Sequence, residues 1–222
     1  MSKQRCKTAI LISGSGSNLQ SFMDRVAAGN SALDLGIVFS NKPDAYGLTR
    51  ARKAGIPTAC IEHGQFESRE AFDRAVAGEL DAWQPELLVL AGFMRILSPW
   101  FVNHYAGRIL NIHPALLPAY PGLNTHQRVL DAGDQWHGST VHFVTEELDG
   151  GPRILQGRLA VDPNETADEL CNRVQSLEHQ IYPEAANWFG QGRLDFRNGQ
   201  AWLDGERLDN PVLVEEHWAT KN

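Results

Sequence analysis

An asparagine and a histidine two positions apart, Asn111 and His113, are the residues of this chain best suited to catalysis. Because alternate side chains of a strand project to the same face, the two would converge on one small volume. An amide donor beside an imidazole suits the polarisation of a carbonyl group and the stabilisation of the oxyanion that it becomes. A carboxylate from a later loop, Asp149, would fix the proton of the imidazole. No Ser, Cys or Lys nucleophile with an obvious base accompanies them, so the pattern favours direct acyl transfer to an amine.

Each of these residues also has an ordinary structural interpretation. His113 alone could be a core or surface histidine, Asn111 could hold a turn, and Asp149 precedes two glycines as turn residues often do. Their position favours the catalytic interpretation, because the pair ends a predicted strand just before a proline-rich loop. In open α/β sheets, ligands bind beyond the carboxyl ends of the strands.

A run of small residues follows the first predicted strand and opens the first predicted helix: Ser13-Gly14-Ser15-Gly16-Ser17-Asn18-Leu19. Small side chains let a ligand approach the backbone closely, and amides at a helix N-terminus favour a phosphate. The run lacks the Lys of a Walker loop, and Leu19 stands at the third glycine position of a dinucleotide fingerprint. The alternative is a plain strand-to-helix turn in which Ser17 caps the helix.

A second candidate ligand surface follows the central strand: Gly92-Phe93-Met94-Arg95-Ile96-Leu97-Ser98-Pro99. An apolar stretch with one arginine suits a flat heteroaromatic ligand that lies against backbone and side chains. A buried connection whose Arg95 caps a neighbouring element is an equal alternative. Arg69, at the start of a predicted helix, and Glu178, beside the apolar stripe of another, would ordinarily be solvated or boundary charges.

The hydrophobic pattern predicts an α/β fold. Strands are predicted at 8–13, 35–40, 56–61, 87–91 and 108–112, with helices at 17–28, 44–54 and 68–83 between them. Such alternation implies a mostly parallel sheet. The pattern changes after 114–122: long strands at 140–145 and 154–161 suggest antiparallel pairing, a long helix starts near Thr166, and 197–200 reads as a hairpin turn. We predict one domain over 1–209, and a polar, frayed tail over 210–222.

Composition excludes several classes of protein. The chain has 222 residues, 42% of them hydrophobic, and a net charge of −7, which argues against nucleic-acid binding. The three cysteines form neither a disulfide framework nor a metal spacing, and no segment is long and apolar enough for a signal peptide or a membrane span, so we expect a cytoplasmic protein. Four further histidines could compete as metal ligands, but no HxH or HxxxH spacing joins any two, and we expect no metal: His104, His126, His137 and His142.

Several motifs, in fixed order from about Lys7 to about Gly205, resemble the phosphoribosylglycinamide formyltransferases, folate-dependent enzymes of purine biosynthesis. They are residues 12–20 (ISGSGSNLQ), 90–97 (LAGFMRIL), 111–118 (NIHPALLP) and 148–152 (LDGGP). One departure is Ala115, where the family usually has Ser. That Ser is not one of the catalytic residues, so we expect the class of function to be unaffected.

The resemblance implies a Rossmann-like three-layer formyltransferase fold, with a phosphate-binding half over about 1–105 and a folate and catalytic half over about 106–209. It implies formyl transfer from 10-formyltetrahydrofolate to the amine of phosphoribosylglycinamide, with no metal, by a monomer or weak homodimer. The implied catalytic residues are Asn111, His113 and Asp149. The implied nucleotide contacts are Gly14, Ser15, Gly16, Ser17, Asn18, Gln175, Ser176, Leu177 and Glu178. The implied folate contacts are Arg69, Met94, Arg95, Ile96, Leu97, Asn111, Thr145, Glu146, Glu147, Leu148 and Asp149.

Four alternatives make different predictions. A formyltetrahydrofolate deformylase carries a regulatory domain before its formyltransferase part, and here the first strand begins near residue 7. A methionyl-tRNA formyltransferase is longer, with a further domain that helps bind tRNA, which the acidic balance disfavours. An NAD(P) oxidoreductase would bind nicotinamide, although the third glycine is absent. A non-catalytic folate- or nucleotide-binding module would bind ligand without turnover.

Overall fold

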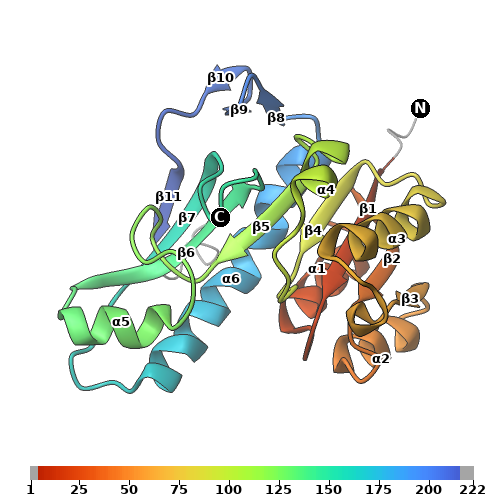
Figure 1. The fold of residues 1–222 in the computed structure, drawn as a ribbon. Helices are drawn as coiled ribbons and strands as arrows, with labels where there is room; N and C mark the ends of the chain where they lie inside the picture. The colour runs from red at the N-terminus through yellow and green to blue at the C-terminus, as the bar shows by residue number, and fades with distance from the viewer. Residues whose placement is uncertain (1–4, 216–222) are drawn as a thin grey trace.

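The computed structural model describes residues 5–215, which form one large mixed sheet covered by helices and a small second sheet (Figure 1). The large sheet has eight strands in the order β11-β7-β6-β5-β4-β1-β2-β3. Its strands are β1 (Cys6–Ile12), β2 (Leu33–Ser40), β3 (Thr58–Cys60), β4 (Leu87–Leu90), β5 (Ile109–His113), β6 (Trp136–Phe143), β7 (Arg153–Ala160) and β11 (Val212–Glu215). All neighbouring pairs are parallel except β5–β6 and β6–β7. The predicted change from parallel to antiparallel pairing is therefore confirmed.

The helices lie on both faces of the sheet, which gives the predicted three layers. They are α1 (Ser17–Ala27), α2 (Tyr46–Lys53), η1 (His63–Gln65), α3 (Arg69–Asp81), α4 (Pro99–His104), α5 (Thr125–Ala132) and α6 (Ala167–Gly190). One buried cluster joins α1, α2, α5 and α6 to the sheet, and a second joins α3 and α4 to its other face. No helix within 5–215 is both long and apolar enough to cross a membrane.

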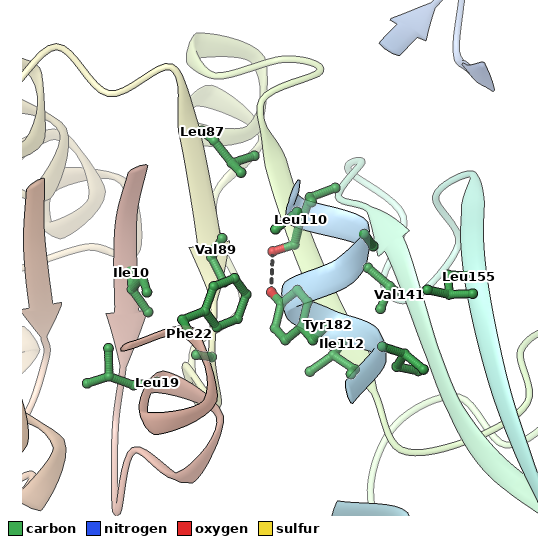
Figure 2. Close-up of a cluster of buried hydrophobic side chains, with 14 of the residues drawn as sticks. Ile10, Leu19, Phe22, Leu87, Val89, Leu110, Ile112, Val141, Leu155 and Tyr182 are labelled. Atoms are coloured by element: carbon green, nitrogen blue, oxygen red, sulfur yellow. Dashed lines mark hydrogen bonds between the residues drawn. The ribbon is translucent and has the colours of Figure 1, made fainter. Parts of the chain in front are cut away.

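Helix α6 crosses the middle of the sheet and fixes the strands that end at the candidate site (Figure 2). The Tyr182 hydroxyl lies 2.9 Å from the Leu110 carbonyl oxygen of β5 and 3.1 Å from that of Leu90 in β4, and both oxygens can accept from it. Gly157 of β7 lets the helix approach closely, because a Cβ there would lie 2.6 Å from Leu177 Cγ. Buried side chains on both strands and on the helix therefore hold β4, β5 and α6 in one arrangement.

Three parts of the fold differ from the prediction. Helices α4 and α5 were not predicted, although α4 has a standard start: the Ser98 hydroxyl accepts from Phe101 N, and Pro99 occupies the first turn. Helix α5 starts from Asn124 in a left-handed conformation with no side-chain cap, so it offers no such signal. Strand β6 begins at Trp136 rather than Thr140.

The prediction of a frayed tail beyond Asp209 is wrong for the described residues. The chain first forms a small antiparallel sheet of β8 (Leu194–Arg197), β9 (Gln200–Leu203) and β10 (Glu206–Arg207), then returns as β11. Strand β11 pairs with β7 in parallel, and Val214 is buried in the main core. The apolar residues of Val212–Glu215 explain this placement, which the polar composition of the whole tail concealed. Residues 216–222 of the predicted tail lie outside the described part.

Candidate active site

The end of β5 places two polar side chains, Asn111 and His113, beside Asp149 and His142, and we call these four residues the polar corner. His113 Nδ1 lies 3.4 Å from Asp149 Oδ2, and both side chains are 7% exposed. Asp149 reaches this point from the loop between β6 and β7 with a left-handed backbone, φ +53°. The predicted meeting of imidazole and carboxylate therefore occurs, and burial makes their electrostatic attraction stronger than it would be in water.

His142 belongs to the polar corner, although the sequence suggested only a competing metal role for it. It stands opposite Asn111 in the β5–β6 pair, and Asn111 Nδ2 lies 3.2 Å from His142 Nε2. His142 Nδ1 lies 2.9 Å from the Phe143 carbonyl oxygen, so Nδ1 carries the proton and Nε2 accepts from the amide. Burial lowers the pKa of His142, which keeps the ring neutral. The ring thus orients the Asn111 amide and leaves one of its N–H groups available.

A loop between β5 and α5 closes the polar corner through main-chain atoms. His113 Nε2 lies 2.8 Å from the Tyr120 carbonyl oxygen, and Gly122 N donates to Asp149 Oδ2 at 3.0 Å. Both ring nitrogens of His113 therefore face oxygen acceptors, an arrangement that suits a ring carrying two protons. Ala115, the departure from the family pattern, is fully buried near the start of this loop, and its carbonyl oxygen accepts from Thr140 Oγ1 at 2.6 Å.

The glycine loop, Ser13–Asn18, lies between β1 and α1 as predicted. The residue before the helix is Gly16, in a left-handed conformation and without a side-chain cap, so the alternative in which Ser17 caps the helix is wrong. A Cβ on Gly16 would lie 2.7 Å from Gly47 Cα, and Gly47 N donates to the Gly14 carbonyl oxygen. Helix α2 therefore braces the loop at a distance that only glycine allows, while the first amides of α1 stay available for an anion.

A cavity of about 350 Å³ runs from the glycine loop toward the polar corner. It is lined by Ser13, Gly14, Ser15, Gly16, Ser17, Asn18, Ala91, Gly92, Met94, Ile112, Pro114, His126, Cys171, Val174, Gln175 and Glu178. Ile112 and Pro114 flank His113 in the sequence, so the cavity connects the loop to the strand that carries the catalytic candidates. The cavity therefore contains the predicted anion-binding loop and reaches the strand that carries Asn111 and His113, although neither of these residues nor Asp149 lines it.

Only part of the predicted run 175–178 reaches this cavity. Gln175 Nε2 donates to Ser17 Oγ at 3.0 Å, and Glu178 is buried at the cavity wall. Leu177 instead packs into the core, while Ser176 is exposed and bonds to the carbonyl of Asn172. The helical period explains the difference, because positions 171, 174, 175 and 178 share one face of α6. We therefore retain only Gln175 and Glu178 of this run as nucleotide contacts.

The predicted folate contacts are not gathered in one closed pocket, and three apolar members of the set are exposed; we call Met94, Ile96 and Leu148 the exposed rim. Met94, Ile96 and Leu148 are 71%, 56% and 57% exposed, which is unusual for such side chains. Arg69 is exposed at the start of α3, and Arg95 stacks over the Phe72 ring at 5.3 Å. Within the loop 144–152, Glu146 Oε1 accepts from Asn103 Nδ2, whereas Thr145 and Glu147 line a separate hollow beside the small sheet. Leu97 is half-buried in the core cluster of α3 and α4.

A second histidine contact was also missed by spacing rules. His126 Nδ1 lies 3.0 Å from His137 Nε2, although the two are eleven positions apart on α5 and β6. Burial lowers the pKa of His126, and lowers that of His137 to about 4. No third ligand joins them, since residues 5–215 contain no group of three His, Cys, Asp or Glu side chains suited to a metal.

Comparison with known proteins gives a consistent result. A family profile described as formyl transferase matches residues 6–186. The chain is 55% identical to the phosphoribosylglycinamide formyltransferase of Escherichia coli over 199 residues, which cover 90% of this chain and 94% of that protein. It is 46% identical to the Haemophilus influenzae enzyme of the same name, over 95% of this chain and 99% of that one. The structure of a phosphoribosylglycinamide formyltransferase from Coxiella burnetii superposes with a TM-score of 0.90 at 48% identity, covering 94% of this chain and 99% of that one.

Proposed function

The chain belongs to the formyl transferase family, and we propose that it transfers the formyl group of 10-formyltetrahydrofolate to the amine of phosphoribosylglycinamide. The observation that carries this proposal is the position of the polar corner beside the cavity of the glycine loop. A phosphate anchored at the loop would direct the amine toward His113. The names of the relatives in E. coli and H. influenzae support the same reaction.

The glycine loop suits the phosphate of the nucleotide. The N-terminus of α1 points into the cavity and carries a partial positive charge, as well as amide donors without helical partners. This local field explains how a chain of net charge −7 could bind an anion. Asn18 at the end of the loop, with Gln175 and Glu178 of α6, would contact the remaining polar groups of the nucleotide.

The exposed rim of Met94, Ile96 and Leu148 suits a flat apolar ring system. Their exposure leaves apolar surface that a heteroaromatic ligand would cover, and the polar corner adjoins it through Asp149. Burial raises the pKa of Asp73, and the charges of Arg95 and Arg69 act in the opposite direction, so both cations lie near Asp73. Two arginines beside an apolar surface fit a ligand that combines a ring with carboxylates, as a folate does.

In the proposed reaction the amine nitrogen forms a bond to the formyl carbon, and the bond from that carbon to the donor nitrogen breaks. The protonated ring of His113 would donate to the formyl oxygen as negative charge develops there, with the substrate oxygen replacing the Tyr120 carbonyl on Nε2. The free N–H of Asn111 would supply a second donor. Asp149 would stabilise the charged ring and accept the proton that the amine loses, directly or through water, and that proton would pass to the donor nitrogen as its bond to the formyl carbon breaks.

A single assay tests the proposal. The protein is incubated with 10-formyltetrahydrofolate, with and without phosphoribosylglycinamide, and the absorbance of the folate is followed. We expect turnover only when the nucleotide is present. Turnover without the nucleotide would instead indicate transfer to water, and ligand binding without any turnover would indicate a binding module.

A further inference from the structure

The carboxyl group of Glu178 is buried at the wall of the cavity without a charged partner. Glu178 is 7% exposed; its Oε2 accepts from Asn18 Nδ2 at 2.9 Å, and its Oε1 lies 2.9 Å from Ser139 Oγ. Within residues 5–215, no Lys or Arg pairs with it or affects its pKa. A buried carboxylate with neither a cation nor several strong donors is costly, so its protonation state needs a specific explanation.

The contacts of Ser139 supply that explanation. Ser139 Oγ lies 2.7 Å from the His113 carbonyl oxygen, which also accepts from Ala115 N at 2.8 Å. A carbonyl oxygen can only accept, and a serine hydroxyl has one proton, so we assign this proton to the shorter of the two contacts, the one with the His113 carbonyl oxygen. Ser139 Oγ can then only accept from Glu178, whose Oε1 must carry a proton. If Glu178 were ionised, one of the two short contacts would bring lone pairs together.

We infer that Glu178 is a neutral carboxylic acid, held in that form by Ser139, and that it positions the Asn18 amide toward the nucleotide. The inference deepens the proposed function and rests on it for the identity of the ligand. Burial raises the pKa of Glu178, although the hydrogen bonds with Asn18 and Ser139 act in the opposite direction. In the neutral form each contact of the chain Asn18–Glu178–Ser139–His113 joins one donor to one acceptor, and one buried side-chain oxygen of this chain is left without a partner.

That oxygen is Asn18 Oδ1, which is buried and has no hydrogen-bond partner within the protein. Because Glu178 Oε2 holds the Nδ2 end of this amide, Oδ1 is the end that is left without a partner, and Asn18 lines the cavity. A hydroxyl or N–H of the nucleotide would satisfy it. The neutral acid also avoids placing a second negative charge in a cavity that receives a phosphate at the glycine loop.

The surrounding titratable groups favour the same state. Cys171 and Tyr182 face Glu178 from its own helix, and burial raises the pKa of both, so neither is charged near neutral pH. His126 of α5 lines the same cavity, and burial lowers its pKa, so it is neutral as well. The glycine loop contributes no ionisable side chain. No neighbouring charge therefore draws the proton from Glu178 when the cavity is free of ligand.

Infrared difference spectroscopy of the ligand-free protein tests the protonation state without reference to activity. The spectrum of the Glu178→Gln variant is subtracted from that of the wild type near neutral pH. We expect the carbonyl stretch of a protonated carboxyl group, shifted in Ser139→Ala, which removes its hydrogen-bond acceptor, and restored in Ser139→Thr, which keeps the hydroxyl. A difference spectrum with carboxylate bands alone would overturn the inference.

Calorimetric binding of ribose 5-phosphate tests the consequence for the ligand. A neutral acid predicts that Glu178→Gln binds within about threefold of the wild type near neutral pH, whereas loss of a charged hydrogen-bond partner would weaken binding by about tenfold or more. Wild-type affinity should also decline as alkaline pH ionises Glu178, and this decline should be smaller in Glu178→Gln. A tenfold loss in Glu178→Gln near neutral pH would contradict the inference.

Gln175→Glu is the matched control, because it places a carboxylate in the same cavity and should weaken binding of the phosphate. If the wild type did not bind ribose 5-phosphate at all, the proposal that this cavity binds the nucleotide substrate would be wrong. The infrared result on the ligand-free protein would then still decide the protonation state of Glu178.

Discussion

At the glycine loop the ligand-facing atoms come from one contiguous run, 13–18, whereas at the polar corner they come from segments near 111–113, 120–122, 142 and 149. The glycine loop is held by main-chain contacts between Gly14, Gly16 and Gly47. The polar corner depends on strand register and on a loop that bonds to two of its side chains. One part of the site is therefore encoded locally, and the other exists only once the sheet has formed.

The two regions should respond differently to substitution. Changes in the polar corner should reduce turnover while ligands still bind, since its groups act on charge that develops during the reaction. Changes in the glycine loop should weaken nucleotide binding and leave folate binding intact. The predictions below test this division, beginning with the largest expected effect.

Replacing His113 with alanine should reduce turnover by about 10⁴, the upper end of what one general acid contributes. The ring is 2.8 Å from the Tyr120 carbonyl oxygen and 3.4 Å from Asp149, so its removal takes a donor from the carbonyl oxygen and leaves Asp149 Oδ2 with Gly122 N. The kinetic constant kcat should fall while the Kd of each ligand changes little, as measured by folate absorbance and calorimetry. Unchanged turnover would remove His113 from the mechanism.

Asn111→Ala should reduce kcat by about 10²–10³, the usual cost of deleting one oxyanion donor. A matched variant, His142→Phe, retains Asn111 but removes the acceptor that orients its amide. It should lose less, about tenfold, because the amide can still reach the oxyanion from a fraction of its orientations. Steady-state assays of both variants separate the effect of the Asn111 donor from the effect of its orientation. Equal losses of kcat would contradict the role of Asn111 as donor and of His142 as the residue that orients it.

Asp149→Asn keeps the shape of the loop but removes the negative charge beside His113. The charged form of the ring should become less favourable, so turnover should fall by about 10² and the remaining activity should shift toward lower pH. A pH–rate profile, with folding checked by circular dichroism, measures both effects. If Asp149 served only the turn, asparagine would replace it well and the profile would match that of the wild type.

Gly16→Val should raise the KM for the nucleotide by about tenfold or more, with little change in the Kd for the folate. The new side chain would meet Gly47 and would also strain a backbone with φ +70°. Gly29→Val is the control for backbone strain alone, because Gly29 has φ +76° and open space around it, away from the cavity. If Gly16→Val weakened the binding of both ligands equally, or if Gly29→Val raised the nucleotide KM as much, the loop would have a structural role only.

The smallest effect on turnover is expected at His137, where the change should appear in stability. Burial lowers the pKa of this ring from 6.5 to about 4, so the folded protein favours its neutral form. Its contribution to stability is present above the ordinary pKa and is lost as pH falls toward about 4, where the unfolded chain takes up a proton first.

The free energy of unfolding should fall between pH 6.5 and pH about 4. In His137→Gln this fall should be smaller than in the wild type by up to ~3 kcal/mol. Urea denaturation near neutral pH and near the lower limit gives the difference, and the exposed His63→Gln serves as the control. Equal acid sensitivity in the wild type and in His137→Gln would contradict the argument.

The contrast between the two regions also explains what the sequence could predict. The glycine loop and the Asn111–His113 pair are short runs with their own geometric meaning, so the loop and the common face of the pair were predicted without knowledge of the fold. The partners His142, Tyr120 and Gly122 were not, because strand register sets the first and main-chain atoms of a loop supply the other two. A pattern of residue types in the sequence does not indicate contacts that depend on strand register or on main-chain atoms.

The same limit applies to the fold. The alternation of apolar segments predicted the parallel half and α6, because each of those elements buries its own stripe or strand. Helix α5 was missed because it starts without a capping side chain. The run Ser176–Leu177 was assigned to the nucleotide by resemblance, and only the orientation of α6 shows that both side chains face elsewhere.

The position of strand β11 near the end of the sequence affects how the sheet is completed during protein synthesis. It pairs Val212 with Leu155 on the outer side of β7, so translation produces this strand after every other strand of the sheet. A nascent chain that has emerged only as far as β10 would present the backbone of β7 as an open edge, which could pair with another chain. The final segment therefore pairs residues 155–158 of β7 last, and a chain that ended near residue 210 would leave them unpaired and open to association with another chain.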